Sequence, residues 1–168
     1  MHSKLISFLV DQHRTALRLL EALVATSERA TKSRRQLLEK LESELYHHML
    51  LEEEIFYPAL EAAAESKREL RVYRAAREEH EATKSMLKDL GATDPASPEF
   101  AKKVKRLKRS VEQHAGEEEA TLFSIVPQVF APEELEAVTR ILMRRHRELE
   151  THRAWSEGAL AMAFSAHE

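Results

Sequence analysis

The sequence predicts an all-α protein, built as an up-down antiparallel four-helix bundle with an additional C-terminal helix. Apolar residues recur at steps of three and four along four long segments, which is the spacing of one helix face. Three glycines and five prolines are few for 168 residues, and clusters of β-branched or aromatic residues are scarce, so long helices are favoured over a sheet. Short links between long helices imply antiparallel neighbours.

Three helices are expected in the first part of the chain. The first spans about residues 3–27. The second spans about residues 33–65 and is expected to bend near Pro58, because proline has no N–H to donate to the helical ladder. The third spans about residues 69–90 and stops at Gly91, a common C-terminal breaker.

Two further helices are expected after a clear loop at residues 94–98. Ser97 followed by Pro98 is a typical helix start, so the fourth helix runs from there to about residue 126. A fifth helix is expected over about residues 132–153. The last dozen residues fit either a frayed helix or a tail.

Length and composition fit one globular domain, with 43% hydrophobic and 33% charged residues. Residues 1–130 are expected to form the bundle, and residues 131–168 to add a helix and tail that pack on the same domain. The formal net charge of −3 gives no general attraction to nucleic acid. The basic residues between Lys102 and Arg109 fit a solvated helix face, so no nucleic-acid partner is expected. A protein partner is left unknown.

The sequence also argues against a membrane protein. No apolar run approaches the roughly 20 residues that a membrane-spanning helix requires. The first ten residues lack the charged-then-apolar pattern and cleavage site of a signal peptide. We therefore expect a cytoplasmic protein without a membrane partner.

Metal ligands must come from nitrogen and oxygen, since the chain has nine histidines and no cysteine. On the second helix, His48 and Glu52 lie within the apolar stripe, which is expected to continue through Ile55 and Ala59. Positions four apart differ by only about 40° around a helix, so both side chains point into the bundle.

The other three long helices also direct polar residues at the core. His114 and Glu118 repeat the same spacing on the fourth helix, while His13 and His80 lie in the stripes of the first and third. Burying two carboxylates beside four imidazoles without compensation would cost several kcal/mol for each ionised group, and a bound cation offsets that cost. The candidate ligands are His13, His48, Glu52, His80, His114 and Glu118.

The ligands fall into an internal repeat. His13 precedes His48 by 35 residues and His80 precedes His114 by 34, so each pair spans one helical hairpin. Two hairpins related by a pseudo-two-fold axis would bring two similar half-sites together. Six ligands suffice for one ion and fit a two-metal centre better.

This arrangement resembles the hemerythrin-like (HHE cation-binding) domain family over about residues 3–126. The segment His48-Met-Leu-Leu-Glu-Glu-Glu-Ile-Phe-Tyr-Pro58 is similar to the second-helix signature of that family. The resemblance implies an oxo- or hydroxo-bridged pair of iron ions, with Glu52 and Glu118 as bridges and the histidines capping each iron. The ligand types alone leave manganese and zinc open.

The sequence departs from oxygen-carrying hemerythrins at two positions. Lys84 stands where those proteins place a second histidine on the third helix, and Glu118 stands where they use aspartate. One iron would then be under-coordinated, or completed by water or by a nearby carboxylate such as Glu81. An open or water-filled position suits reaction with dioxygen, peroxide or nitric oxide, or looser iron binding, and so argues less for reversible oxygen carriage.

Several functions remain open at this point. The first is a di-iron protein that binds or reacts with such a small oxidant. The second is an iron-sensing or iron-storing module without turnover, and the third is a purely structural helical adaptor. Whether the protein is an enzyme is therefore left undecided.

Other conspicuous residues have structural interpretations. Phe56 and Tyr57 are expected to seal the bundle against water. His47 lies about 100° from His48 around the helix, which suits a surface residue or a partner of a ligand more than a ligand. Acidic neighbours of the ligands fit solvated faces or partners that orient the ligands, namely Glu53, Glu54, Glu117 and Glu119. Four histidines outside the repeat are expected to be solvated, namely His2, His146, His152 and His167.

Overall fold

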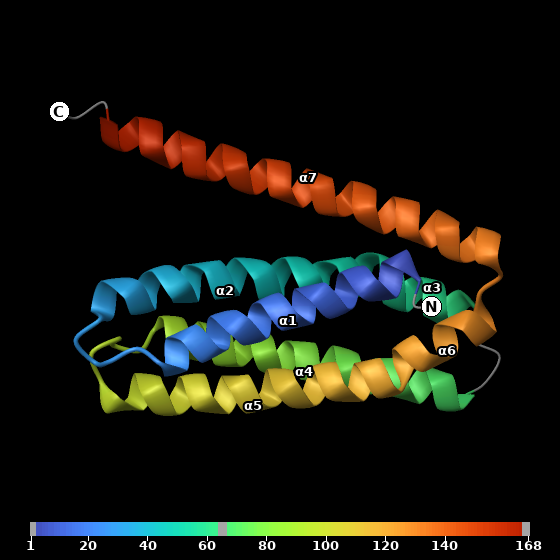
Figure 1. The fold of residues 1–168 in the computed structure, drawn as a ribbon, viewed down its shortest axis with the longest axis horizontal. Helices are drawn as coiled ribbons and strands as arrows, with labels where there is room; N and C mark the ends of the chain where they lie inside the picture. Colours follow the sequence, from blue (N-terminus) through green and yellow to red (C-terminus); the bar gives the residue numbers. More distant parts are fainter. Residues whose placement is uncertain (1–2, 64–66, 166–168) are drawn as a thin grey trace.

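The structure is a computed structural model that describes residues 3–63 and 67–165, and it confirms the all-α bundle with an extra helix (Figure 1). Its elements are α1 (Lys4–Val24), α2 (Thr31–Leu51), the π-helix η1 (Glu52–Phe56), α3 (Tyr57–Ala63), α4 (Lys67–Gly91), α5 (Pro98–Ala120), α6 (Leu122–Val129) and α7 (Pro132–Ser165). The continuous run α2–η1–α3 forms one arm of the bundle, and α5–α6 forms another. Contacts between α1 and α2, α4 and α5, and α1 and α5 hold the arms together.

Serine residues form the N-caps of two long helices, α1 and α5. The Ser3 hydroxyl accepts a hydrogen bond from the Ile6 N–H at 3.2 Å, and Ser97 does the same for Phe100 at 3.3 Å. These contacts satisfy backbone donors that have no partner within the helix. The start of the fourth long helix at Ser97 and Pro98 is therefore where the sequence predicts it.

The expected bend near Pro58 takes the form of a wide helical turn directly before it. The N–H of Tyr57 donates to the carbonyl of Glu52, five residues back, which defines the π-helix η1. A proline ring collides with the carbonyl four residues earlier, so a regular α-helix cannot pass through Pro58 undisturbed. The extra residue in the turn shifts the inward face, and Phe56, Tyr57 and Leu60 are buried. The expected inward positions Ile55 and Ala59 are only half-buried.

Two apolar clusters fill the bundle, one towards each end. The first lies around α6, η1 and the start of α1, and its most buried members are Leu5, Leu9, Leu51, Phe56, Tyr57, Val126 and Leu142. The second lies towards the loops 25–30 and 92–97, and its most buried members are Leu20, Leu41, Leu90, Phe100, Val104 and Leu107. On α1, α4 and α5 the predicted ligands fall between the two clusters in the sequence, and on the α2–η1 arm His48 and Glu52 lie where one cluster gives way to the other. The polar layer is thus enclosed by apolar packing above and below.

A buried arginine ties together the two loops at one end of the bundle. The Arg34 side chain is 2% exposed and donates to the Pro95 carbonyl and to both the carbonyl and the hydroxyl of Thr26. Its guanidinium also lies 5.1 Å from the centre of the Phe100 ring, a favourable cation–π contact. Arg34 therefore joins the α1–α2 loop to the α4–α5 loop.

The C-terminal helix α7 extends beyond the expected end at residue 153 and lies beside α2 in Figure 1. Leu142 joins the first apolar cluster, and Arg145 pairs with Glu54 at 2.9 Å. His146 was expected to be solvated but is half-buried, with its ring edge-to-face on Phe8. The division into residues 1–130 and 131–168 stays a prediction.

Two remaining expectations concern the chain ends and the membrane. Residues 166–168, and with them His167, lie outside the described residues, as does His2. Among residues 3–63 and 67–165, none of the helices is long and apolar enough to cross a bilayer.

Replacing Arg34 by alanine should lower the free energy of unfolding by about 3 kcal/mol, because the Pro95 and Thr26 carbonyls would lose their buried donor. Urea denaturation followed by circular dichroism measures the loss. The exposed neighbour Arg35 supplies the control, and Arg35→Ala should change the unfolding free energy by less than about 0.5 kcal/mol. Equal losses in the two variants would contradict the role assigned to Arg34.

Candidate metal centre

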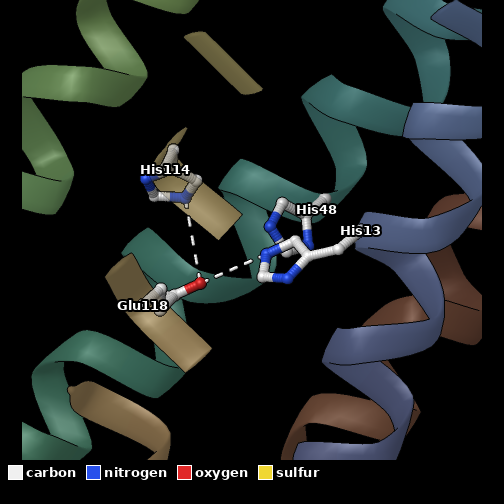
Figure 2. Close-up of side chains that lie close together, drawn as sticks. All are labelled: His13, His48, His114 and Glu118. Carbon is white, nitrogen blue, oxygen red and sulfur yellow. Dashed lines mark ion pairs between the residues drawn. The ribbon is translucent and has the colours of Figure 1, made fainter. Parts of the chain in front are cut away.

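The fold brings all six predicted ligands into one buried layer. They come from four arms of the bundle, with His13 on α1, His48 on α2, Glu52 at the start of η1, His80 on α4, and His114 and Glu118 on α5. Their ligand atoms form two overlapping groups, each within 4.8 Å. One group holds His13, His48, His114 and Glu118 (Figure 2), and the other holds Glu52, His80 and His114.

Each glutamate lies between histidines of both hairpins. An oxygen of Glu118 lies 3.2 Å from Nε2 of His13 and 3.8 Å from Nε2 of His114, as the dashed lines in Figure 2 show. Oε2 of Glu52 lies 3.2 Å from Nε2 of His80 in its own group, and 3.2 Å from Nε2 of His48 in the first group. The two pairings are related in the same way as the two halves of the internal repeat.

The outward-facing nitrogen of each histidine has its own hydrogen-bond partner. Nδ1 contacts run from His13 to Glu119 (3.0 Å), from His48 to Gln12 (3.2 Å), from His80 to Glu53 (2.9 Å) and from His114 to Glu79 (2.8 Å). A neutral imidazole carries a single N–H, and these acceptors draw it to Nδ1. Each Nε2 is then left with a lone pair aimed at the centre, which is the arrangement of metal-binding histidines.

These outer partners follow the same repeat as the ligands. Gln12 and Glu79 directly precede the single histidines, and each holds the second histidine of its own hairpin. Glu53 and Glu119 directly follow the inner glutamates, and each holds the single histidine of the opposite hairpin. The sequence interpretation left Glu53 and Glu119 as solvated or orienting residues, and they orient ligands. It missed Gln12 and Glu79, although their position before each single histidine was a usable signal.

Two further acidic neighbours lie outside the donor set. Glu54 pairs with Arg145 of α7, and Glu117 is exposed and accepts a hydrogen bond from Gln113. His47 also points away from the centre, with its Nδ1 3.5 Å from Glu150 of α7.

Lys84 points at an outer partner and not at the centre. Its Nζ lies 3.0 Å from both oxygens of Glu53 and 2.7 Å from Glu81. The suggestion that Glu81 completes the coordination is wrong here, because its side chain is 73% exposed and paired with Lys84. Lys84 instead places a positive charge beside the carboxylate that holds His80.

Tyr57 is a polar member of the centre, whereas the sequence suggested only a seal. Its hydroxyl lies 2.9 Å from Glu118, 3.1 Å from Glu52 and 3.3 Å from Nε2 of His80. In a regular α-helix, residues five apart point about 140° away from each other. The π-turn brings residue i+5 above residue i, so Tyr57 sits over Glu52. Burial, followed by the charges of Glu52 and Glu118, raises the pKa of Tyr57, which therefore stays protonated.

In the metal-free layer, burial and neighbouring charges shift the pKa values of all four histidines and of Glu52. Burial lowers the pKa of His13, but its contacts with Glu118 and Glu52 outweigh this and raise the pKa to about 9. Burial, then repulsion from Glu118, raises the pKa of Glu52 well above its ordinary value. Burial lowers the pKa of the other three histidines, most strongly for His48. Protons on His13 and Glu52 thus take the place that a cation would occupy.

The residues present fit a metal. Within the described part of the chain, buried ligand atoms without a hydrogen-bond partner include Nε2 of His13 and His48, Oε1 of Glu52 and Oε2 of Glu118. Nε2 of His13 and Oε2 of Glu118 lie 3.2 Å apart, but they do not have the geometry of a hydrogen bond. Nε2 of His80 and of His114 also face each other at 3.2 Å. Lone pairs held this close repel each other unless a cation or a proton lies between them.

Binding of a divalent cation at pH 7 should release protons, because His13, with a pKa of about 9, must give up its proton to bind metal. Below that pKa the proton competes, so affinity should fall by about tenfold per pH unit for this one site. Calorimetric titration of zinc into metal-free protein, in two buffers of different ionisation enthalpy, counts the released protons. Identical heats in the two buffers would contradict protonation of the metal-free layer.

Comparison with known proteins shows the family of the chain. No curated protein matches the sequence. The crystal structure of a hemerythrin HHE cation-binding domain-containing protein from Mycobacterium kansasii has the same fold, with a TM-score of 0.72, 23% identity and 88% of each chain covered. The sequence profile of the hemerythrin HHE cation-binding domain matches residues 4–126. The resemblance noted in the sequence is thereby confirmed, and the chain belongs to the hemerythrin HHE cation-binding family.

Proposed function

We propose that the protein is a non-haem di-iron protein that binds or reacts with a small oxidant such as dioxygen, peroxide or nitric oxide. The observation that supports this best is Tyr57, a buried and protonated hydroxyl that touches both central carboxylates. A cation with a purely structural role needs no hydrogen-bond donor beside it, whereas an oxygen ligand at the metal can accept a hydrogen bond from Tyr57.

The donor set favours two cations over one. Four imidazoles and two carboxylates form two overlapping groups that share His114. Glu52 and Glu118 each lie between histidines of both hairpins, a placement suited to a carboxylate that bridges two ions. Four-helix bundles hold di-iron and di-manganese centres with comparable carboxylate and histidine sets. We propose iron over manganese and zinc because of the family resemblance, since the same ligand types accept all three.

Iron, when bound, would supply redox and Lewis-acid chemistry. The chain's own residues orient and shield it. Outer hydrogen bonds fix the four imidazole rings, and apolar clusters on both sides exclude bulk water. The Tyr57 hydroxyl lies within hydrogen-bond reach of both carboxylates and stays protonated, so it can donate a hydrogen bond to an oxygen ligand.

An iron-sensing or iron-storing module without turnover is the second candidate. It is favoured by the position of the polar layer between the two apolar clusters, with ligands from every arm of the bundle. Loss of the metal leaves buried polar atoms without partners, and such a fold can depend on its metal.

Iron reconstitution followed by metal analysis and optical spectroscopy separates the candidates. The di-iron proposal expects two irons per chain and charge-transfer bands that change with azide, peroxide and nitric oxide. Tyr57→Phe should keep the iron content but slow the reaction with peroxide by roughly tenfold to a hundredfold, because a hydrogen bond to the charged oxygen ligand is lost. Iron that stabilises the fold and ignores all three molecules would support the sensor. Lack of stoichiometric metal, or unchanged metal content in a His48→Ala/His114→Ala variant, would contradict both.

A further inference from the structure

A hollow of about 460 Å³ between α4 and the α5–α6 junction leads from the surface to the metal centre. Ala75 and Ala76 of α4 form part of one wall. His114 and Glu118, two of the predicted ligands, lie in the opposite wall on α5. The hollow therefore reaches the polar layer that the rest of the bundle encloses.

Local sequence explains why the bundle is open here. Two consecutive alanines on α4 leave space that larger side chains would fill. On the other side, the helix is interrupted at Thr121, whose backbone angles (φ −111°, ψ −71°) depart from helical values between α5 and α6. Thr121 also lines the hollow, so the break in the helix lies at its edge.

Carboxylates are graded from solvent to centre along this hollow. Glu117 is exposed, the side chain of Glu79 is 32% exposed, and that of Glu118 is 1% exposed. Among the described residues that line the hollow, there is neither lysine nor arginine. Two other hollows on the surface are of mixed charge, since Lys105, Lys108 and Arg109 line one and Arg140, Arg144 and Arg147 line the other, and glutamate lines both. Acidic lining attracts cations and repels anions over a Debye length.

A second observation links the acidic lining to a ligand. Oε2 of Glu118, which ends the series of carboxylates, is buried and has no hydrogen-bond partner among the described residues. The same oxygen lies 3.2 Å from His13 and 3.8 Å from His114. A cation that follows the carboxylates inward thus arrives at an unsatisfied oxygen beside the imidazoles of His13 and His114.

We propose that this hollow is the loading route by which a hydrated divalent cation reaches the centre. Glu117 attracts the cation at the mouth, Glu79 is the next carboxylate inward, and His114 with Glu118 receives it as its water is shed. Glu79 also accepts the hydrogen bond from Nδ1 of His114. The same carboxylate therefore lines the route and orients the imidazole that receives the cation. This proposal rests on the metal centre proposed above and adds how the metal enters it.

The test is the rate of cobalt(II) uptake by the full-length, metal-free protein, followed by stopped-flow visible absorption, with cobalt content measured at the end. Ala75→Leu should narrow the hollow and Glu117→Gln should weaken the attraction, and each should slow uptake at least threefold without changing the final content. The effect of Glu117→Gln should shrink in about 0.5 M salt, because screening weakens long-range attraction. Both positions are exposed on helices, so the variants are expected to fold.

Matched controls make the same changes away from the hollow. Ala62→Leu enlarges another exposed helical alanine, and Glu99→Gln removes a charge on α5 about 27 Å along the helix from Glu117. Both controls should take up cobalt at the wild-type rate. Wild-type rates in Ala75→Leu and Glu117→Gln, with full cobalt content, would overturn the loading route while leaving the centre intact. A wild-type protein that binds no cobalt or iron would overturn the centre as well.

Discussion

Four imidazole lone pairs and two carboxylates converge in the middle of the bundle, and the rest of the structure depends on how that convergence is held. Nε2 of His80 and His114 lie 3.2 Å apart, a distance that bare lone pairs do not tolerate without an intervening positive charge. The outer contacts at Nδ1 prevent the rings from turning away. Apolar clusters above and below close the layer towards both ends of the bundle. A bound cation would accept all of these lone pairs and so offset their mutual repulsion.

The wide turn at Glu52–Phe56 links the fold to the chemistry of the site. It begins at one inner carboxylate and ends before Tyr57, whose hydroxyl contacts both carboxylates. Pro58 makes a regular helix unfavourable at this point, and the resulting extra residue aims the phenol inward. Arg145 of α7 pairs with Glu54 inside the same turn, so the C-terminal helix also contacts this part of the bundle. The turn thus combines a backbone irregularity with a functional group, as π-bulges at functional sites often do.

Much of the fold and the inner donor set could be predicted from the sequence, because helical periodicity is a local property. His48 and Glu52 share a face whatever the rest of the chain does, and the repeat places the two hairpins together. Tyr57 was misjudged because a one-residue widening of the turn changes the face it occupies, and proline signals only that some disturbance occurs. Arg34 was missed because its acceptors lie in loops 8 and 61 residues away in the sequence. Gln12 and Glu79 were missed although each directly precedes a single histidine, because the ring that each one holds lies on a neighbouring helix.

The most direct test of the central claim is an anomalous difference map, collected at the iron edge, from crystals of the iron-loaded protein. The account predicts two peaks inside the bundle, with Glu52 and Glu118 between them. Each of the four histidine Nε2 atoms should lie about 2.1 Å from one of the two peaks. The Nδ1 contacts to Gln12, Glu53, Glu79 and Glu119 should persist in that structure. A map without peaks among these residues, or with peaks only at the surface, would contradict the account.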